Sequence, residues 1–353
     1  MQGTNVIFSK RLKSAREMKG LSMAELSDTM DNIVSPQAIY KYESGKMLPN
    51  AGILKSLADA LKLPVDYFFK EYKIALSNIE FRKKASLLVK ERRAIETTSY
   101  DRVEKYLEVI DICGDNLNEF RREQGIISSK EDVIDAVGRV RKQHNLGDDP
   151  ILNVLQFLEN LGIIVIIITN ENPKFDGLSG IANRTPVVVL NSILPAERIR
   201  FTALHELGHL IMNFDENLDE KAREKLCHTF ASEMLLPREK FEALMNERLS
   251  KKIALPELAV IQKAYGISID AIMYKAKEIG IISDRTLKSY HILKNQNPKF
   301  KEYAETSRTG KEESDKFENM VMRAFDCRLI TTDQAAMFLG TTATEIEYKS
   351  LII

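Results

Sequence analysis

The sequence has few cysteines, no net charge and no long apolar run, and each of these absences excludes a class of protein. Its three cysteines form neither a CxxC pair nor an even set, which argues against a disulfide-stapled secreted domain and favours a reducing compartment. Lys plus Arg (51) equals Asp plus Glu (51), so any surface that binds nucleic acid must be local. The longest apolar run, Leu161 to Ile168, is eight residues long, against the ~20 of a membrane-spanning helix, and the N-terminus lacks the apolar stretch of a secretory signal. We therefore expect a soluble, cytoplasmic protein with no membrane partner.

The pattern of residues divides the chain, whose 353 residues suffice for two or three domains, into four parts. Residues 1–72 are short helices separated by turns, and residues 73–128 form a charged, helical connecting arm. Residues 129–240 alternate helices with β-branched strands, as in a small α+β domain, and residues 241–353 are again helical. The predicted fold class is multidomain and mainly α, with an all-α N-terminal domain, an α+β domain with a small sheet, and a helical C-terminal region.

Several segments outside the two main domains have distinctive compositions. The connecting arm carries a cluster of basic residues: Arg82, Lys83, Lys84, Lys90, Arg92 and Arg93. The stretch 294–317 is poor in apolar residues, which predicts a loop or linker, and 318–349 returns to helical periodicity. Two stretches around Gly266 and Gly340 have the rhythm of a helix-turn-helix without a basic face, so we expect helical packing or dimerisation there.

Three of the five histidines lie within 24 positions, and two of them belong to the motif HELGH. His205 and His209 are four residues apart in the apolar helix FTALHELGHLIM, so both imidazoles can reach one zinc ion. Glu206, beside the first histidine, can take a proton from the water that the zinc activates. Two histidines on an apolar face can also be core residues. A metal is the better explanation because buried imidazoles and a buried carboxylate are costly without a partner.

The next helix offers a third ligand. Glu224 lies 15 residues after His209, and His228 lies one turn further along the same face. We choose Glu224 as the third metal ligand. His228 is then a group that supports the ligands, an oxyanion-stabilising group, or an alternative ligand. Cys227 could also bind zinc, but its apolar neighbours favour plain packing.

These motifs resemble the ImmA/IrrE family of zinc-dependent peptidases over roughly residues 130–240. The resemblance is carried by HELGHLIM and EKLCHTFASEMLLP, with the turn FDGLSGIA and the strand VVVLN upstream. It implies three zinc ligands and one general base, namely His205, His209, Glu224 and Glu206. Cys227 and His228 stand where the family commonly has alanine and asparagine, and the second departure leaves the choice between Glu224 and His228 open.

The N-terminal residues have the spacing of a helix-turn-helix, with SMAELSDTM as scaffold helix and PQAIYKYE as recognition helix. Residues 8–70 resemble the XRE family of phage Cro- and repressor-like proteins, in which the recognition helix enters the major groove of double-stranded DNA. Four residues are the expected contacts to an operator: Ser35, Gln37, Ala38 and Lys41. Met23 stands where many members have a glutamine, so one contact is missing. Residues 1–72 carry ten Lys/Arg against eight Asp/Glu, so DNA affinity requires a homodimer, the basic arm, or both. The alternative is a domain that binds protein.

Together the two resemblances imply a transcriptional regulator that couples DNA binding to limited proteolysis. The implied protein substrate is a repressor or another helix-turn-helix protein, in a stress response or in the control of a mobile element. The strand VVVLN suggests that an extended peptide binds by β-augmentation if this is an edge strand, whereas a buried strand would offer no free edge. The alternative function is a non-proteolytic regulator or antitoxin-like protein whose metallopeptidase-like domain senses a ligand or binds a partner. The intact Glu206 favours the enzyme, because a structural zinc site does not need it.

Overall fold

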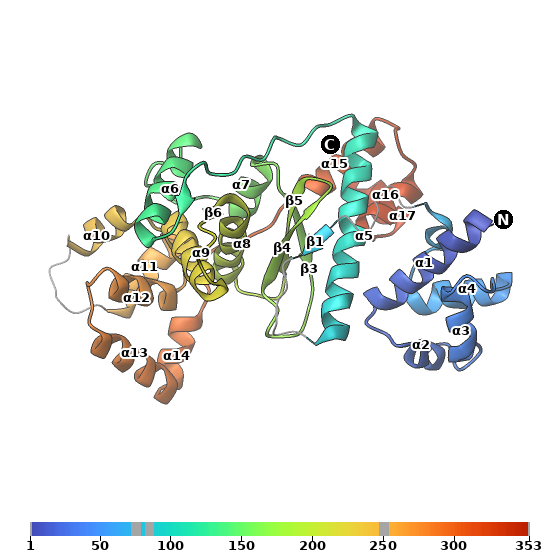
Figure 1. Ribbon diagram of the computed structural model, residues 1–353, viewed down its shortest axis with the longest axis horizontal. Helices are drawn as coiled ribbons and strands as arrows, with labels where there is room; N and C mark the ends of the chain where they lie inside the picture. The colour runs from blue at the N-terminus through green and yellow to red at the C-terminus, as the bar shows by residue number, and fades with distance from the viewer. Residues whose placement is uncertain (1, 72–78, 82–87, 247–253, 352–353) are drawn as a thin grey trace. The chain divides into compact units, whose positions relative to one another are not determined.

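The computed structural model describes residues 2–71, 79–81, 88–246 and 254–351. The chain forms two compact units, which we call unit 1 and unit 2 (Figure 1). Unit 1 contains Met1–Asn116, Ile181–Asn183 and Asp315–Ile353, and unit 2 contains Leu117–Gly180 and Arg184–Ser314. The predicted C-terminal region 241–353 is therefore divided between the two units at residue 314. The multidomain, mainly α fold class is confirmed.

The N-terminal part of unit 1 is a small helical domain. Its elements are α1 (Gln2–Met18), α2 (Met23–Thr29), α3 (Pro36–Glu43), α4 (Ala51–Leu61) and the 3₁₀ helix η1 (Val65–Phe69). Ser22 accepts a hydrogen bond from the backbone N–H of Glu25 and the Glu25 carboxylate accepts one from Ser22, which is the capping box that begins α2. The core of the domain is buried and includes Leu26, Ile39 and Leu57, each 0% exposed.

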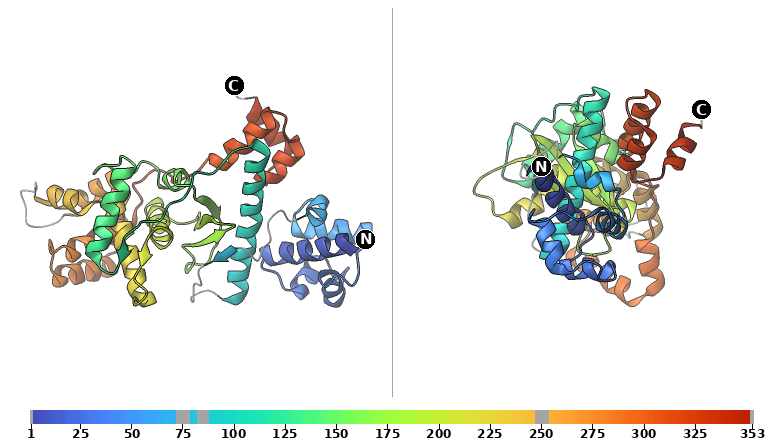
Figure 2. Two further views of the ribbon diagram at one scale, coloured as in Figure 1. Left: turned by 45° about the horizontal axis from the view of Figure 1, so that its top comes forward. Right: turned by 90° about the vertical axis from the view of Figure 1, so that its right-hand side faces the viewer.

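A long helix joins the two ends of unit 1. Its remaining elements are β1 (Ile79–Phe81), α5 (Val89–Cys113), α15 (Lys316–Asp326), α16 (Thr332–Leu339) and α17 (Ala343–Ser350). Helix α5 packs against α1 on one side and α15 on another (Figure 2). A buried, bidentate ion pair between Arg11 and Glu104 joins α1 to α5, and Tyr106 stacks on Phe317 of α15.

The basic cluster of the arm is only partly described. Residues 82–84 lie outside the described residues, so their predicted role stays a prediction. Lys90, Arg92 and Arg93 begin α5, and each forms an ion pair with a glutamate: Glu25, Glu96 and Glu17, respectively. These three cations are therefore already partnered within unit 1.

Unit 2 is built around a small sheet and two buried helices. Its first elements are β2 (Ile126–Ile127), α6 (Lys130–Gln143), α7 (Val154–Asn160), β3 (Ile164–Ile168), β4 (Gly177–Ala182), β5 (Thr185–Asn191), α8 (Ala196–Ile211), β6 (Asn213–Phe214) and α9 (Glu220–Leu235). Strand β5 lies between β4 and β3 and pairs in parallel with β3, with Ile166 opposite Val189. The segment VVVLN is therefore an interior strand. The hypothesis that it offers a free edge to a peptide is wrong, because both of its edges are already hydrogen-bonded.

The rest of unit 2 is helical. It consists of α10 (Arg238–Asn246), α11 (Leu255–Tyr265), α12 (Ile269–Glu278), α13 (Asp284–Gln296) and α14 (Pro298–Glu305). Helix α14 falls inside the predicted linker 294–317, which is therefore wrong in part. Asn297 caps this helix and Pro298 occupies its first turn, so local signals outweigh its polar composition. An ion pair between the buried Lys275 and Glu233 ties α12 to α9.

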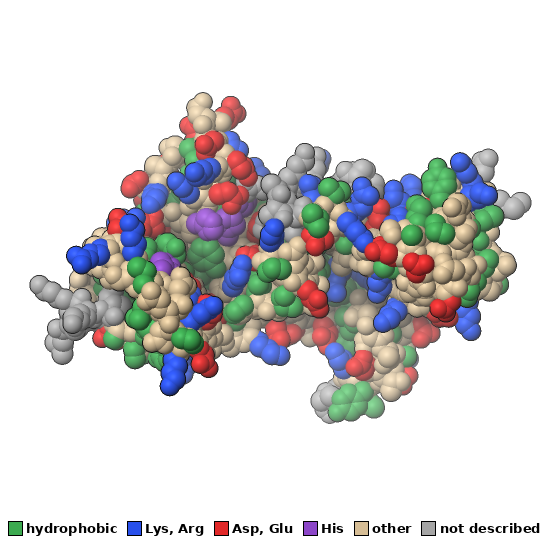
Figure 3. Space-filling model, turned by 90° about the horizontal axis from the view of Figure 1, so that it is seen from below, with side chains coloured by type: hydrophobic (Ala, Val, Ile, Leu, Met, Phe, Trp, Pro, Cys, Tyr) green, Lys and Arg blue, Asp and Glu red, His purple; other side chains and the backbone are tan. Residues whose placement is uncertain are grey.

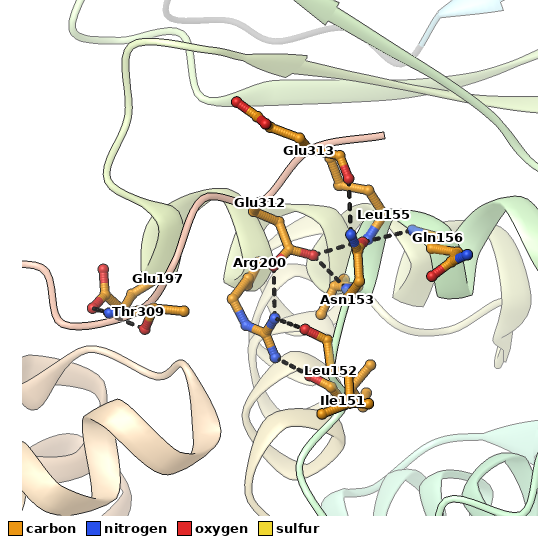
Figure 4. Close-up of polar contacts among 11 residues, drawn as sticks. Ile151, Leu152, Asn153, Leu155, Gln156, Glu197, Arg200, Thr309, Glu312 and Glu313 are labelled. Carbon is orange, nitrogen blue, oxygen red and sulfur yellow. Dashed lines mark hydrogen bonds and ion pairs between the residues drawn. The ribbon is translucent and has the colours of Figure 1, made fainter. Parts of the chain in front are cut away.

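After α14 the chain continues as a non-helical segment, residues 306–314, which we call the strap. Glu312 of the strap accepts hydrogen bonds from the backbone N–H groups that begin α7 and from Arg200 of α8, as Figure 4 shows. In return, Glu197 of α8 accepts hydrogen bonds from the backbone N–H groups of Arg308 and Thr309. The strap is thus held to the rest of unit 2 by two buried carboxylates.

Among the described residues, no helix is both long enough and apolar enough to cross a lipid bilayer.

Candidate metal centre

The predicted HELGH helix is α8, and it is buried on nearly all sides. It lies between the strands and α9 (Figure 1), and twelve of its sixteen residues are buried. Gly208 permits the close approach of α9, because a Cβ atom there would lie 3.3 Å from the Phe230 ring and 3.4 Å from the Cys227 sulfur. Asp219 caps α9 by accepting a hydrogen bond from the backbone N–H of Ala222. The two helices are therefore fixed side by side.

Three potential ligand atoms converge between these helices. The Nε2 atoms of His205 and His209 lie 3.1 Å apart. The Glu224 carboxylate oxygens lie 3.1 Å from His205 Nε2 and 3.3 Å from His209 Nε2. Donor atoms that each bond to one zinc ion at about 2 Å in tetrahedral geometry lie about 3.3 Å apart, which is close to these separations. Two imidazoles and a carboxylate with this spacing fit a zinc ion, so the residues present suit the predicted cofactor.

The charge state of the third residue also suits a cation. Hydrogen bonds from His205 and then His209 hold the pKa of Glu224 well below its usual range. The side chain is therefore a carboxylate at neutral pH, as a metal ligand must be. The face seen in Figure 3 exposes one larger group of histidine side chains and a separate smaller one. The Glu224 side chain is 41% exposed, so the site can be reached from solvent.

The predicted general base lies on the same helix, beside His205 and one turn before His209. Glu206 is 2% exposed, and its Oε2 atom accepts a hydrogen bond of 2.7 Å from the Ser179 hydroxyl. Ser179 is on β4 and is itself 2% exposed. Ser179 is not among the residues predicted from the sequence. Its motif FDGLSGIA was noted, but no local pattern indicates that the serine faces a glutamate 27 positions away.

The two residues whose roles were left open have distinct positions. His228 is exposed, and its ring centroid lies 4.6 Å from that of His205 and 5.8 Å from that of Phe201. The group of ligand atoms found among the described residues contains Glu224 and not His228. Cys227 is fully buried, as plain packing predicts, but its sulfur also lies 3.0 Å from Nδ1 of His209, on the side of the ring away from Glu224.

The predicted DNA-contacting residues lie at the cap and along the length of α3, from Ser35 before its first turn to Lys41 in its last turn. Gln37 and Lys41 are exposed on one face of the helix, four residues apart. Ser35 caps the helix by accepting a hydrogen bond from Ala38 N, and Ala38 packs partly against the core. The same exposed face carries a residue that the sequence analysis did not single out, Tyr40, which is 52% exposed.

Comparisons with protein families agree with this division of the chain. Residues 12–68 match the helix-turn-helix family model, and residues 158–277 match the model of the IrrE N-terminal-like domain. The second match continues past the predicted boundary at residue 240 and includes α11 and most of α12. A comparison with curated proteins found no match. The chain therefore combines a helix-turn-helix domain with a peptidase-like domain of the IrrE/ImmA type, the fusion that the sequence resemblance predicted.

Proposed function

We propose that this protein is a transcriptional regulator in which unit 2 is a zinc-dependent peptidase that cleaves a protein substrate at one or a few positions. The observation that supports this most directly is the convergence of the His205, His209 and Glu224 donor atoms, with Glu206 on the turn between the two histidines. A purely structural zinc site has four protein ligands and no carboxylate kept for proton transfer.

The residues of unit 2 then have distinct roles. His205, His209 and Glu224 hold the zinc, which when bound supplies Lewis-acid activation of water and of the scissile carbonyl. Glu206 accepts the proton of the attacking water on its carboxylate and passes it to the nitrogen of the leaving amine. His228, beside His205 and exposed, is placed to donate a hydrogen bond to the oxyanion that forms on the carbonyl.

The N-terminal domain directs this activity to DNA. Gln37 is exposed at the start of α3, where a recognition helix meets base edges, and its amide suits adenine. Lys41 suits the phosphate backbone. The resemblance to the two families makes a repressor or another helix-turn-helix protein the proposed substrate, and a stress response or mobile-element control the proposed setting.

The decisive experiment compares the wild-type chain with Glu206→Gln. Both proteins are purified at full length, their zinc content is measured, and each is incubated with a repressor encoded by a neighbouring gene. We expect about one zinc ion per chain in both proteins. Mass spectrometry of the fragments should detect cleavage by the wild type only. His209→Ala is the control for the metal and should lose both zinc and cleavage. Equal cleavage by Glu206→Gln would refute the mechanism. Bound zinc that changes DNA affinity, with no cleavage, would favour a metal-sensing regulator.

A further inference from the structure

Strand β4 and helix α8 touch at two consecutive points. A Cβ atom on Gly177 would lie 2.8 Å from the side chain of Thr202 and 2.7 Å from the carbonyl oxygen of Val189, so only glycine fits. Two residues further along β4, the Ser179 hydroxyl lies 2.7 Å from Glu206. Residues two apart in a strand share a face and lie about 7 Å apart, and residues four apart in a helix share a face and lie about 6 Å apart. The spacing of Gly177 and Ser179 along β4 therefore matches the spacing of Thr202 and Glu206 along α8.

We propose that Ser179 is a positioning residue for the proposed peptidase reaction. It fixes the Glu206 carboxylate in the orientation needed for proton transfer, while Gly177 lets the strand come close enough for this hydrogen bond. The inference rests on the proposed function, because it assigns Ser179 a role through the general base. Ser179 is not expected to touch the substrate.

Four physical features support this role. The terminal torsion of a glutamate side chain is broad, so a carboxylate without a fixed partner samples many orientations. A hydroxyl that donates to a carboxylate makes a short, charge-assisted hydrogen bond, and 2.7 Å is such a length. Ser179 and Glu206 are each only 2% exposed, so bulk water competes little for this bond. The serine is also fixed, since it belongs to a strand that is hydrogen-bonded to its neighbour β5.

A purely structural role makes different predictions. If Ser179 only satisfied a buried acceptor, its removal would lower stability, and any loss of activity would follow the loss of folded or zinc-loaded protein. A positioning role lowers kcat at unchanged zinc content and nearly unchanged KM, because substrate contacts are untouched. If Ser179 positions Glu206, removing the Ser179 hydroxyl also moves the Glu206 carboxylate in the substrate-free protein.

The test uses the full-length chain with three substitutions. Ser179→Ala removes the hydroxyl, and Ser179→Thr keeps it. Thr229→Val is the matched control, because Thr229 is a buried residue of α9 whose hydroxyl donates a hydrogen bond within its own helix, to the carbonyl oxygen of Lys225. We measure zinc content, kcat and KM for cleavage, and we determine crystal structures of the metal-free wild type and Ser179→Ala proteins.

We expect Ser179→Ala to lower kcat about tenfold or more, the rate equivalent of one charge-assisted hydrogen bond, with KM and zinc content within twofold of the wild type. Ser179→Thr should recover most of this loss, and Thr229→Val should resemble the wild type. In the crystal, the Glu206 carboxylate of Ser179→Ala should leave its wild-type position. A carboxylate that keeps its position overturns the proposal, as does an unchanged kcat in an active enzyme. If the wild type cleaves nothing, the proposed function fails, and the crystal structures alone decide whether Ser179 positions Glu206.

Discussion

Replacing Glu312 by alanine should release the strap from the rest of unit 2. The Glu312 carboxylate accepts hydrogen bonds from the N–H groups of Val154 and Leu155 and from Arg200, whose side chain is only 3% exposed. Breaking a buried ion pair costs about 3–5 kcal/mol because it leaves a charge buried without its partner. We expect about 3 kcal/mol, the lower end of that range, because Arg200 still donates to the carbonyl oxygen of Ile151.

Hydrogen exchange measured by mass spectrometry suits this prediction, because it reports on single segments of the full-length chain. A loss of about 3 kcal/mol raises the population of the open state roughly a hundredfold. Exchange in the strap and in the first turn of α7 should therefore accelerate by about that factor, and exchange in the helices of unit 1 should not change. Glu313→Ala is the matched control, since Glu313 is the adjacent residue, its side chain is 62% exposed, and its only described ion pair is with the exposed Lys311.

Two outcomes would refute this reasoning. If Glu312→Ala and Glu313→Ala gave the same exchange rates, the buried carboxylate would not be what holds the strap. If the double substitution Glu312→Met with Arg200→Met exchanged as fast as Glu312→Ala, the cost would lie in the lost N–H partners of α7 and not in the unpaired cation.

Three further predictions concern other parts of the chain. Gly266→Ala should lower the midpoint of urea unfolding, measured by circular dichroism, far more than Gly280→Ala. Both glycines have positive φ, but of these two only Gly266 would gain a Cβ atom that collides, 2.3 Å from an arginine nitrogen. Equal losses in the two variants would exclude the collision as the cause. Hydrogen bonds from the backbone and side chains of the preceding serines lower the pKa of Asp132 to about 2. This carboxylate therefore stabilises the start of α6 above about pH 4, and the stabilisation is lost as the pH falls towards 2. Amide NMR signals at the start of α6 should follow this titration in the wild type and not in Asp132→Asn. Gln37→Ala should reduce the preference for operator over random DNA by about 1–3 kcal/mol in a gel-shift titration, whereas Lys41→Ala should weaken both alike and lower the salt slope by about one, and the reverse pattern would contradict the assigned roles.

Local signals in the sequence predicted much of this structure. The predicted scaffold helix SMAELSDTM is α2, and its start depends on a local signal, the capping box between Ser22 and Glu25 three residues apart. The spacing of His205 and His209 predicted that both imidazoles share a face, because helix geometry alone determines it. Glu224 lies on the following helix, so its approach to the histidines depended on only one further assumption, that α8 and α9 pack together.

The features that the sequence did not predict depend on contacts between distant segments. Ser179 meets Glu206 across 27 positions and Glu312 meets Arg200 across 112, and no periodicity or cap signals either pair. The strap looked like a linker because it has few apolar residues. It is held by hydrogen bonds to carboxylates, for which a polar composition is no obstacle. Whether VVVLN is an edge or an interior strand likewise depends on which strands pair, and a β-branched sequence fits both.

The polar residues of α8 show how one helix can serve two chemical roles. Neighbouring residues point about 100° apart around a helix and residues three apart only about 60°, so Glu206 points away from His205 but lies near the face of His209. Helix α9 supplies Glu224 to the histidines, while strand β4 supplies Ser179 to the glutamate. The proposed zinc ligands and the proposed base are therefore held by different neighbouring elements, α9 and β4. Substitutions on β4 should therefore slow proton transfer without changing zinc affinity. Substitutions of Glu224 should instead weaken zinc binding while the Glu206 carboxylate stays in place.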